Sequence, residues 1–220
     1  MPDTPSLHSV QVTRTARVAT LGSPASADVG WIVLHGYGQL AADFATQFES
    51  IVAPNRCVIA PEGLSRFYVD GLGSHDEVGA SWMTREDRDH EIQDYVADLD
   101  DVVQHVRSDE ADLSIRVLGF SQGAATANRW ALLGDTTIDR LVLWGGAPAH
   151  DLDLSVHADA LRAMDLTIVV GTDDPYVTDE RRTAVRRRLA RHDIPVTIHT
   201  FEGGHRLDDE TLQAVVENAQ

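Results

Sequence analysis

The sequence predicts an α/β fold in which a mostly parallel β-sheet is covered by helices on both faces. Short apolar and β-branched runs alternate with segments of helical periodicity along the whole chain. Residues 31–34 form a continuous apolar run, and residues 166–170 are apolar except for Thr167, which is typical of strands buried on both faces. A length of 220 residues, 43% of them hydrophobic, indicates one domain over residues 1–220.

The N-terminal half contains three predicted strand regions and one helix. Residues 8–20 are interpreted as a strand pair or hairpin, residues 31–34 and 56–60 as buried strands, and residues 40–50 as a helix. Residues 61–85 show no clear period and are predicted to form a long loop. A loop of that length inside a compact domain is usually functional.

Predicted strands and helices alternate more regularly in the C-terminal half. Apolar residues between positions 92 and 106 recur at three- and four-residue steps, with Asp and Glu on the other face, which predicts an amphipathic helix. The remaining elements are predicted strands at 113–120, 140–144, 166–170 and 196–201, and predicted helices at 122–133, 178–191 and 208–219.

The chain is strongly acidic. It has 35 acidic and 18 basic residues and a formal net charge of −17, which argues against nucleic acid as a partner. All 18 basic residues are arginine, and 25 of the acids are aspartate. This composition favours a protein adapted to a salt-loaded cytoplasm. Codon usage in a high-GC genome is the alternative explanation.

Cysteine content and hydropathy limit the class of protein further. The single Cys57 excludes an intramolecular disulfide and a cysteine-based zinc site, and its apolar surroundings indicate a buried core residue. The N-terminus has no basic region followed by an apolar stretch, and no apolar run approaches about 20 residues. We therefore expect a soluble, cytoplasmic protein without membrane insertion.

Two charged segments invite other interpretations. His90 and Asp94 would share one helix face, but no second histidine completes a metal-ligand set, so we expect a solvated acidic face, no metal and no cofactor. The predicted helix 178–191 carries six arginines without interleaved aromatics. Ion pairing with neighbouring acids or a subunit contact explains them better, and the latter leaves a homodimer open.

A Gly-x-Ser-x-Gly motif follows the predicted strand 113–120. It comprises residues 119–123, Gly-Phe-Ser-Gln-Gly, and the predicted helix begins directly after Ser121. A nucleophile elbow needs this order of strand, sharp turn and helix, with glycines where any side chain would clash. The alternative is a structural turn in which Ser121 caps the helix.

An acid and a histidine follow two later strands. Asp173 and Asp174 come after the strand 166–170, and His205 comes after the strand 196–201. The carboxyl ends of parallel strands meet at one edge of a sheet, so we expect these side chains near Ser121. A serine hydroxyl needs a neutral imidazole to take its proton and a carboxylate to orient that imidazole. Either aspartate could be that carboxylate, and turn or surface roles are the alternatives.

The segment 34–39, Leu-His-Gly-Tyr-Gly-Gln, follows the buried strand 31–34. One backbone donor of an oxyanion hole is expected in this segment, and the second is the N–H of the residue after the nucleophile, Gln122. A glycine-rich turn is compatible with this role.

These motifs resemble the phospholipase/carboxylesterase family of α/β-hydrolases over about residues 29–215. The matching runs are 34–38 (LHGYG), 119–124 (GFSQGA), 171–177 (GTDDPYV) and 203–206 (GGHR). The family includes bacterial carboxylesterases and acyl-protein thioesterases, described as small and lidless. The resemblance implies a three-layer α/β-hydrolase fold without a cap domain, with Asp174 as the acid before the proline and Tyr37 as the first oxyanion N–H donor.

Two features depart from the family pattern. Gln39 stands where the family often has Asp, and residues 81–85 (SWMTR) do not match the tryptophan-phenylalanine-aspartate run of the thioesterases. The second departure weighs against an acyl-protein substrate and leaves the hydrolytic residues unaffected.

We therefore expect a serine carboxylesterase that acts on short to medium acyl esters through an acyl-enzyme. Ser121 is the expected nucleophile, His205 the base and Asp174 the orienting acid, with Tyr37 and Gln122 as oxyanion donors. An apolar wall for the acyl chain is expected from Phe67, Tyr68, Trp82 and Met83, with ordinary packing as the alternative. The alternative functions are an acyl thioesterase, an acyl peptidase, or a catalytically silent binding protein of the same fold.

Overall fold

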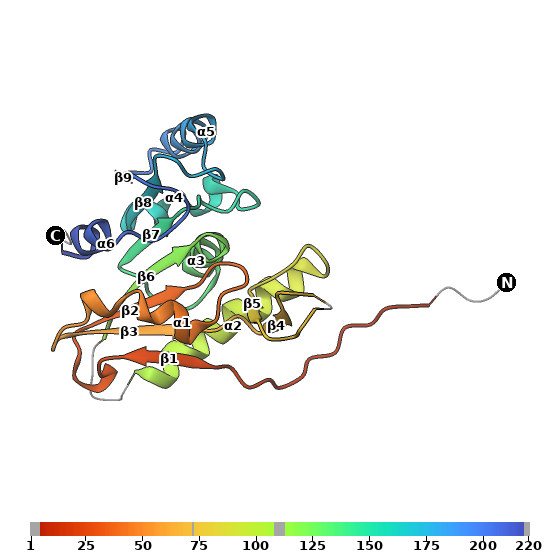
Figure 1. The fold of residues 1–220 in the computed structure, drawn as a ribbon. Helices are drawn as coiled ribbons and strands as arrows, with labels where there is room; N and C mark the ends of the chain where they lie inside the picture. Colours follow the sequence, from red (N-terminus) through yellow and green to blue (C-terminus); the bar gives the residue numbers. More distant parts are fainter. Residues whose placement is uncertain (1–4, 72, 108–112, 218–220) are drawn as a thin grey trace.

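The centre of the molecule is a seven-stranded sheet (Figure 1), seen in a computed structural model that describes residues 5–71, 73–107 and 113–217. Its strands, in spatial order, are β1 (Val18–Leu21), β3 (Arg56–Pro61), β2 (Val29–Leu34), β6 (Ser114–Phe120), β7 (Arg140–Trp144), β8 (Asp165–Gly171) and β9 (Thr197–Phe201). β1 pairs antiparallel with β3, and all other neighbours in this sheet are parallel. The predicted mostly parallel sheet is confirmed.

Helices cover both faces of the sheet, which gives three layers. One face packs against α2 (Arg88–Val106), α3 (Gln122–Leu133), α4 (Leu154–Ala163) and α5 (Asp179–Ala190), and the other against α1 (Ala41–Thr46) and α6 (Asp209–Glu217). Alternate residues of β2 point to opposite faces of the sheet. Ile32 and Leu34 belong to the hydrophobic cluster under α2 to α5, and Trp31 and Val33 belong to the cluster under α1 and α6. Among the described residues, no insertion forms a cap over the sheet, as predicted.

The predicted strand pair at residues 8–20 is wrong. Only Val18–Leu21 forms a strand, and residues 5–17 run as an exposed segment away from the body of the molecule (Figure 1). The register explains this, because Val18 lies opposite Pro61, the last residue of β3. Beyond one further backbone bond, from the Glu62 N–H to the Arg17 oxygen at 2.9 Å, earlier residues lie past the end of β3 and do not continue the ladder.

The predicted loop 61–85 contains a short antiparallel hairpin that the sequence analysis missed. Its strands are β4 (Ser65–Tyr68) and β5 (Val78–Ser81), and an isolated bridge between Gln39 and Ala80 joins it to the loop after β2. Each strand has only four residues, and β5 includes a glycine and a serine. A period-two pattern has too few positions to be recognised over that length.

Three further differences concern helices. α4 was not predicted, although Asp153 caps it by accepting from the Ser155 N–H at 2.9 Å. The helix predicted at 40–50 is divided into α1 and a 3-10 helix at Glu49–Ile51. The last helix, predicted at 208–219, is α6, and positions 218–219 lie outside the described residues.

Candidate active site

Ser121 lies at the junction between β6 and α3, in the sharp turn that the motif predicts. Its φ of 56° and ψ of −114° are strained for a residue with a side chain. The flanking glycines are required by close packing. A Cβ on Gly119 would lie 2.1 Å from the Gly123 oxygen, and one on Gly123 would lie 2.1 Å from the Leu34 oxygen. The backbone therefore holds Ser121 at the carboxyl edge of the sheet.

Three side chains from three strand ends form a continuous hydrogen-bonded chain. The Nε2 atom of His205 lies 2.8 Å from the Oγ atom of Ser121. The Nδ1 atom of His205 lies 2.7 Å from Asp174 Oδ2. Because an ionised carboxylate only accepts hydrogen bonds, Nδ1 carries the imidazole proton, and in the neutral ring Nε2 is free to accept the serine proton. This is the arrangement required to activate a serine hydroxyl.

The two candidate aspartates have different environments. Asp174 is buried, and its Oδ1 atom also accepts from the Tyr176 N–H at 2.8 Å. Asp173 is exposed, and its nearest side-chain partner is the Thr172 hydroxyl at 3.3 Å. Of these two aspartates, Asp174 is the one that is hydrogen-bonded to His205.

Aromatic rings hold the imidazole of His205 on two sides. The Phe120 ring centroid lies 4.9 Å from that of His205, and the Tyr176 ring meets it edge-on at 4.8 Å. Both residues neighbour the site in sequence, since Phe120 precedes Ser121 and Tyr176 follows Asp174 by two positions. The ring contacts restrict rotation of His205 and keep its two nitrogens directed at Asp174 and Ser121.

The loop after β2 presents one backbone N–H between two that are already bonded. Gly36 N–H donates to Gln39 Oε1 at 2.8 Å, and Gly38 N–H donates to the Ala80 oxygen at 2.9 Å. The N–H of Tyr37, between them, has no acceptor in the described part of the chain, and neither has the N–H of Gln122. Two such donors beside a nucleophile could stabilise an oxyanion.

The buried side chain of His35 holds this loop in place through hydrogen bonds, a role that was not predicted from the sequence. It is fully buried, its Nδ1 lies 2.7 Å from the Gly36 oxygen, and its Nε2 accepts from Gly63 N–H at 3.0 Å. Burial lowers the pKa of His35, so the ring is neutral and both nitrogens are used. A histidine directly after a buried strand was the available signal.

The Gln122 side chain is a second contribution that sequence reasoning missed. Its Nε2 donates to the Met83 oxygen at 2.8 Å, and its Oε1 accepts from the Trp82 N–H at 3.2 Å. These bonds connect the first turn of α3 to the chain that leaves β5. The residue predicted for its backbone N–H thus also anchors the neighbouring segment through its side chain.

The four residues predicted to form an acyl wall have separate positions. Trp82 is buried, stacked on His35 at 4.8 Å, and Met83 packs against the core. Phe67 contacts the Tyr37 ring at 5.0 Å, while Tyr68 is half exposed and stacked on His75 at 4.4 Å. None of the four lines the cavity that opens at Ser121.

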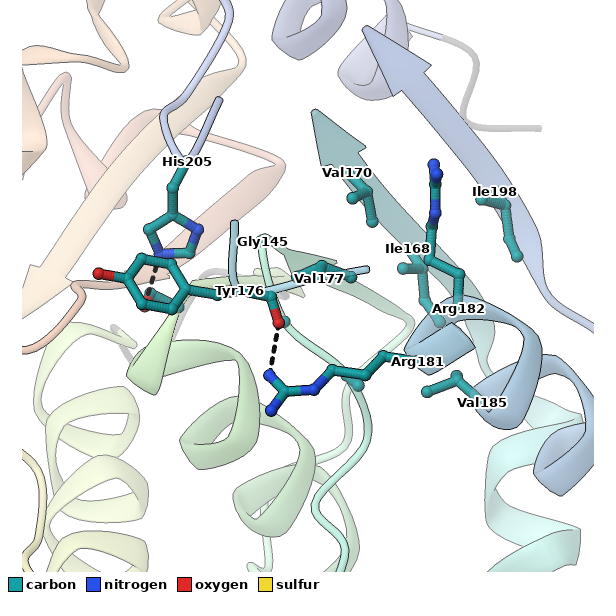
Figure 2. Close-up of a pocket in the computed structure, with 13 residues that line it drawn as sticks. Gly145, Ile168, Val170, Tyr176, Val177, Arg181, Arg182, Val185, Ile198 and His205 are labelled. Carbon is teal, nitrogen blue, oxygen red and sulfur yellow. Dashed lines mark hydrogen bonds between the residues drawn. The ribbon is translucent and has the colours of Figure 1, made fainter. Parts of the chain in front are cut away.

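That cavity opens beside His205 and Tyr176 (Figure 2). Its volume is about 320 Å³. Most of its wall comes from the turn after β7, from apolar side chains of β8, β9 and α5, and from the loop before α5. These residues are Gly145, Gly146, Ala147, Ile168, Val170, Val177, Val185 and Ile198, and two arginines of α5 also line the cavity. The sequence analysis missed this wall because its residues come from elements that meet only in the fold.

The described residues were compared with the requirements of a metal site and of a membrane-spanning helix. In the described ranges, no three His, Cys, Asp or Glu side chains are grouped so that they could hold a metal ion. The His90 imidazole is instead bonded to Asp87 Oδ1 at 2.7 Å. No helix in these ranges is long and apolar enough to cross a membrane.

Comparison with known proteins places the chain in a family. The model of the phospholipase/carboxylesterase family matches residues 14–219. The chain belongs to the phospholipase/carboxylesterase family. It is therefore a hydrolase of the esterase and thioesterase type. Membership of this family confirms the prediction of a serine hydrolase. No curated protein sequence matches the chain.

Solved structures share the α/β-hydrolase fold of this phospholipase/carboxylesterase family member at low identity. Acyl-protein thioesterase 2 of Zea mays has a TM-score of 0.69 at 18% identity, covering 91% of this chain and 96% of its own. A carboxylesterase of Mesorhizobium loti has a TM-score of 0.66 at 20% identity, covering 90% and 91%. A phospholipase/carboxylesterase of Dyadobacter fermentans has a TM-score of 0.63 at 18% identity, covering 94% and 98%.

Proposed function

We propose that the protein is a single-domain serine carboxylesterase that hydrolyses short to medium acyl esters through an acyl-enzyme. The observation that carries the proposal is the hydrogen-bonded chain from Asp174 through His205 to the Ser121 hydroxyl, with spacings of 2.7 and 2.8 Å. All three residues follow strands of the same sheet, so their spacing depends on how β6, β8 and β9 are held within it.

In the first half of the reaction, Ser121 Oγ attacks the ester carbonyl carbon while His205 Nε2 takes the hydroxyl proton. The resulting tetrahedral intermediate collapses, the carbon–oxygen bond to the alcohol breaks, and His205 returns its proton to the departing oxygen. Asp174 stabilises the imidazolium that exists between these steps. The products are a free alcohol and an ester of Ser121.

In the second half, water attacks the acyl-Ser121 ester with His205 again as the base, which releases the carboxylic acid and restores the serine hydroxyl. Both tetrahedral intermediates carry a negative oxygen. The backbone N–H groups of Tyr37 and Gln122 donate to it, and each such donor is worth about 10²–10³ in kcat by analogy with other hydrolases.

The acyl group is proposed to lie on the Tyr37 side of Ser121. Phe67 packs on the exposed Tyr37 ring there and remains our candidate for contact with the acyl chain. Trp82 and Met83 act beneath this surface, as partners of the Gln122 side chain. An open apolar surface of this kind suits short to medium chains better than long ones.

A panel of p-nitrophenyl esters and acyl thioesters of increasing chain length tests the proposal. We expect the highest kcat/KM with short to medium esters, and loss of activity in Ser121→Ala. A higher kcat/KM for thioesters of every length would replace the carboxylesterase with a thioesterase. Hydrolysis that persists in Ser121→Ala would overturn the mechanism.

We also propose that the protein is adapted to high salt in the cytoplasm. The support is its net charge of −17, with 25 aspartates and arginine at all basic positions. Acidic surfaces of this density repel themselves at low ionic strength, and guanidinium groups can still pair bidentately with carboxylates.

A further inference from the structure

The cavity beside His205 combines an apolar wall with two arginines. Arg181 and Arg182 both lie in the first turn of α5 and line the cavity together with Val177 and Val185 (Figure 2). An esterase for purely apolar substrates has no use for cations there. Whether each of these cations is already paired with a carboxylate therefore decides which ligand the cavity favours.

Only one of the two arginines is neutralised by a carboxylate. Arg182 pairs with Asp179, one turn earlier on the same helix, and its side chain is largely buried. Arg181 forms no ion pair within the described residues. Its Nη1 donates to the Tyr176 carbonyl oxygen at 2.6 Å, which leaves the other N–H groups of its guanidinium available. The cavity thus has one uncompensated positive charge.

The bond to Tyr176 connects Arg181 directly to the triad. Tyr176 packs edge-on against His205, and its own N–H donates to Asp174 Oδ1. In Figure 2 the guanidinium of Arg181 extends back from α5 to the Tyr176 backbone, while Arg182 points in another direction. The free cation is therefore fixed against the same loop that orients the catalytic histidine.

The position of the cavity indicates which half of the ester it receives. His205 and Tyr176 line it, whereas the oxyanion donors Tyr37 and Gln122 do not. In the proposed reaction His205 protonates the departing oxygen, so the alcohol half lies on the His205 side of Ser121. The leaving group consequently enters the cavity, and its far end reaches the arginines.

The charge distribution along the chain strengthens this point. Residues 179–191 contain six of the 18 arginines and only two acids, in a chain with a net charge of −17. An anionic substrate is repelled by most of the acidic surface and attracted at this helix. The guanidinium of Arg188 is engaged within the protein, since it donates to the backbone oxygens of Pro148, Ala149 and Leu152.

We propose that Arg181 binds a carboxylate on the alcohol half of the ester, so that the preferred substrates are acyl esters of hydroxy-carboxylates. One free guanidinium matches one carboxylate in charge and in its planar, bidentate geometry. The inference rests on the proposed function, because it uses the role of His205 to assign the leaving-group side.

Two acetyl esters that differ only in the leaving group test this inference. 4-Acetoxybenzoate carries a carboxylate, and 4-acetoxybenzamide is a neutral analogue of similar size. Both form the same acetyl-enzyme, and their intrinsic reactivities are the same for every variant, so the change in their ratio of kcat/KM from wild type to variant reports recognition of the leaving group. We expect the wild type to prefer the benzoate and Arg181→Gln to lower that preference about fivefold, the worth of a partly exposed ion pair.

Arg187→Gln is the matched control, because it removes the same charge from an exposed position of α5 outside the cavity. It should leave both the ratio and the rate with the neutral ester unchanged. An unaltered ratio in Arg181→Gln, or an equal loss in both variants, overturns the inference while the proposed function stands. No hydrolysis of either ester by the wild type contradicts the proposed function itself.

Discussion

The side-chain amide of Gln122 donates to the carbonyl oxygen of Met83, 2.8 Å away. Together with the bond from the Trp82 N–H to Oε1, it fixes the segment after β5 against the first turn of α3. The backbone N–H of the same residue is a proposed oxyanion donor. A single residue therefore couples the position of that donor to a loop far away in sequence.

Gln122→Ala keeps the backbone N–H and removes both side-chain bonds. We expect kcat to fall about tenfold, with little change in KM, because the oxyanion donor shifts while the cavity wall is unaffected. Gln93→Ala, on the exposed face of α2, is the control. Wild-type kcat in Gln122→Ala would show that the side chain has no part in positioning the site.

Asp174→Ala should lower kcat by roughly 10⁴, as loss of the orienting carboxylate does in other triads. Asp173→Ala should have a small effect, because its exposed carboxylate contacts Thr172 rather than His205. Steady-state kinetics of the two variants compare neighbouring aspartates in one loop. Similar losses at both positions would contradict the assignment of Asp174.

The pH dependence of stability should include a contribution from Asp98 on α2. Its Oδ2 atom is buried and has no hydrogen-bond partner among the residues that the structure describes. Burial, assisted by the charge of Asp101, raises its pKa to about 6 despite Arg14. The folded state therefore retains this proton at pH values where the unfolded chain has lost it. Stability consequently falls as the pH rises from about 4 to about 6.

Asp98→Asn removes this penalty. We expect the variant to be about 1 kcal/mol more stable than the wild type near pH 7.5, with a smaller difference near pH 4.5, in urea unfolding. Asp94→Asn, at an exposed position of the same helix, controls for the removal of one negative charge. A gain in stability that is equal in both variants, or absent in Asp98→Asn, would contradict the prediction.

Salt should stabilise the protein. At about 1 M salt the screening length falls to roughly 3 Å, which removes most of the repulsion that a net charge of −17 produces on the folded surface. We expect the melting temperature to rise by at least about 5 °C between roughly 0.1 M and 2 M NaCl. An unchanged or lower melting temperature would favour codon usage as the origin of the composition.

The sequence was most informative where geometry depends on a few neighbouring residues. The Gly-x-Ser-x-Gly motif predicts the turn at Ser121, because only glycine fits at 119 and 123 against the adjoining backbone. Buried parallel strands such as β2 and β8 are rich in apolar residues, so their approximate ends, and the side chains that follow them, could be predicted from the sequence order.

Features that depend on contacts between distant segments could not be predicted. The hairpin β4–β5 is too short to show a period, and its attachment relies on the bridge between Gln39 and Ala80. The cavity wall brings together β8, β9 and α5, and its free cation is identified only by the pairing of Arg182 with Asp179. No local pattern in the sequence distinguishes Arg181 from its neighbour.

The most direct test of the account is covalent labelling with a fluorophosphonate probe, followed by mass spectrometry of the modified peptide. The central claim is that His205 activates Ser121, whose Oγ lies 2.8 Å from its Nε2. We expect a single label on Ser121, which disappears in Ser121→Ala and forms far more slowly in His205→Ala. Absence of labelling on the folded protein, or a label on any other residue, would contradict it.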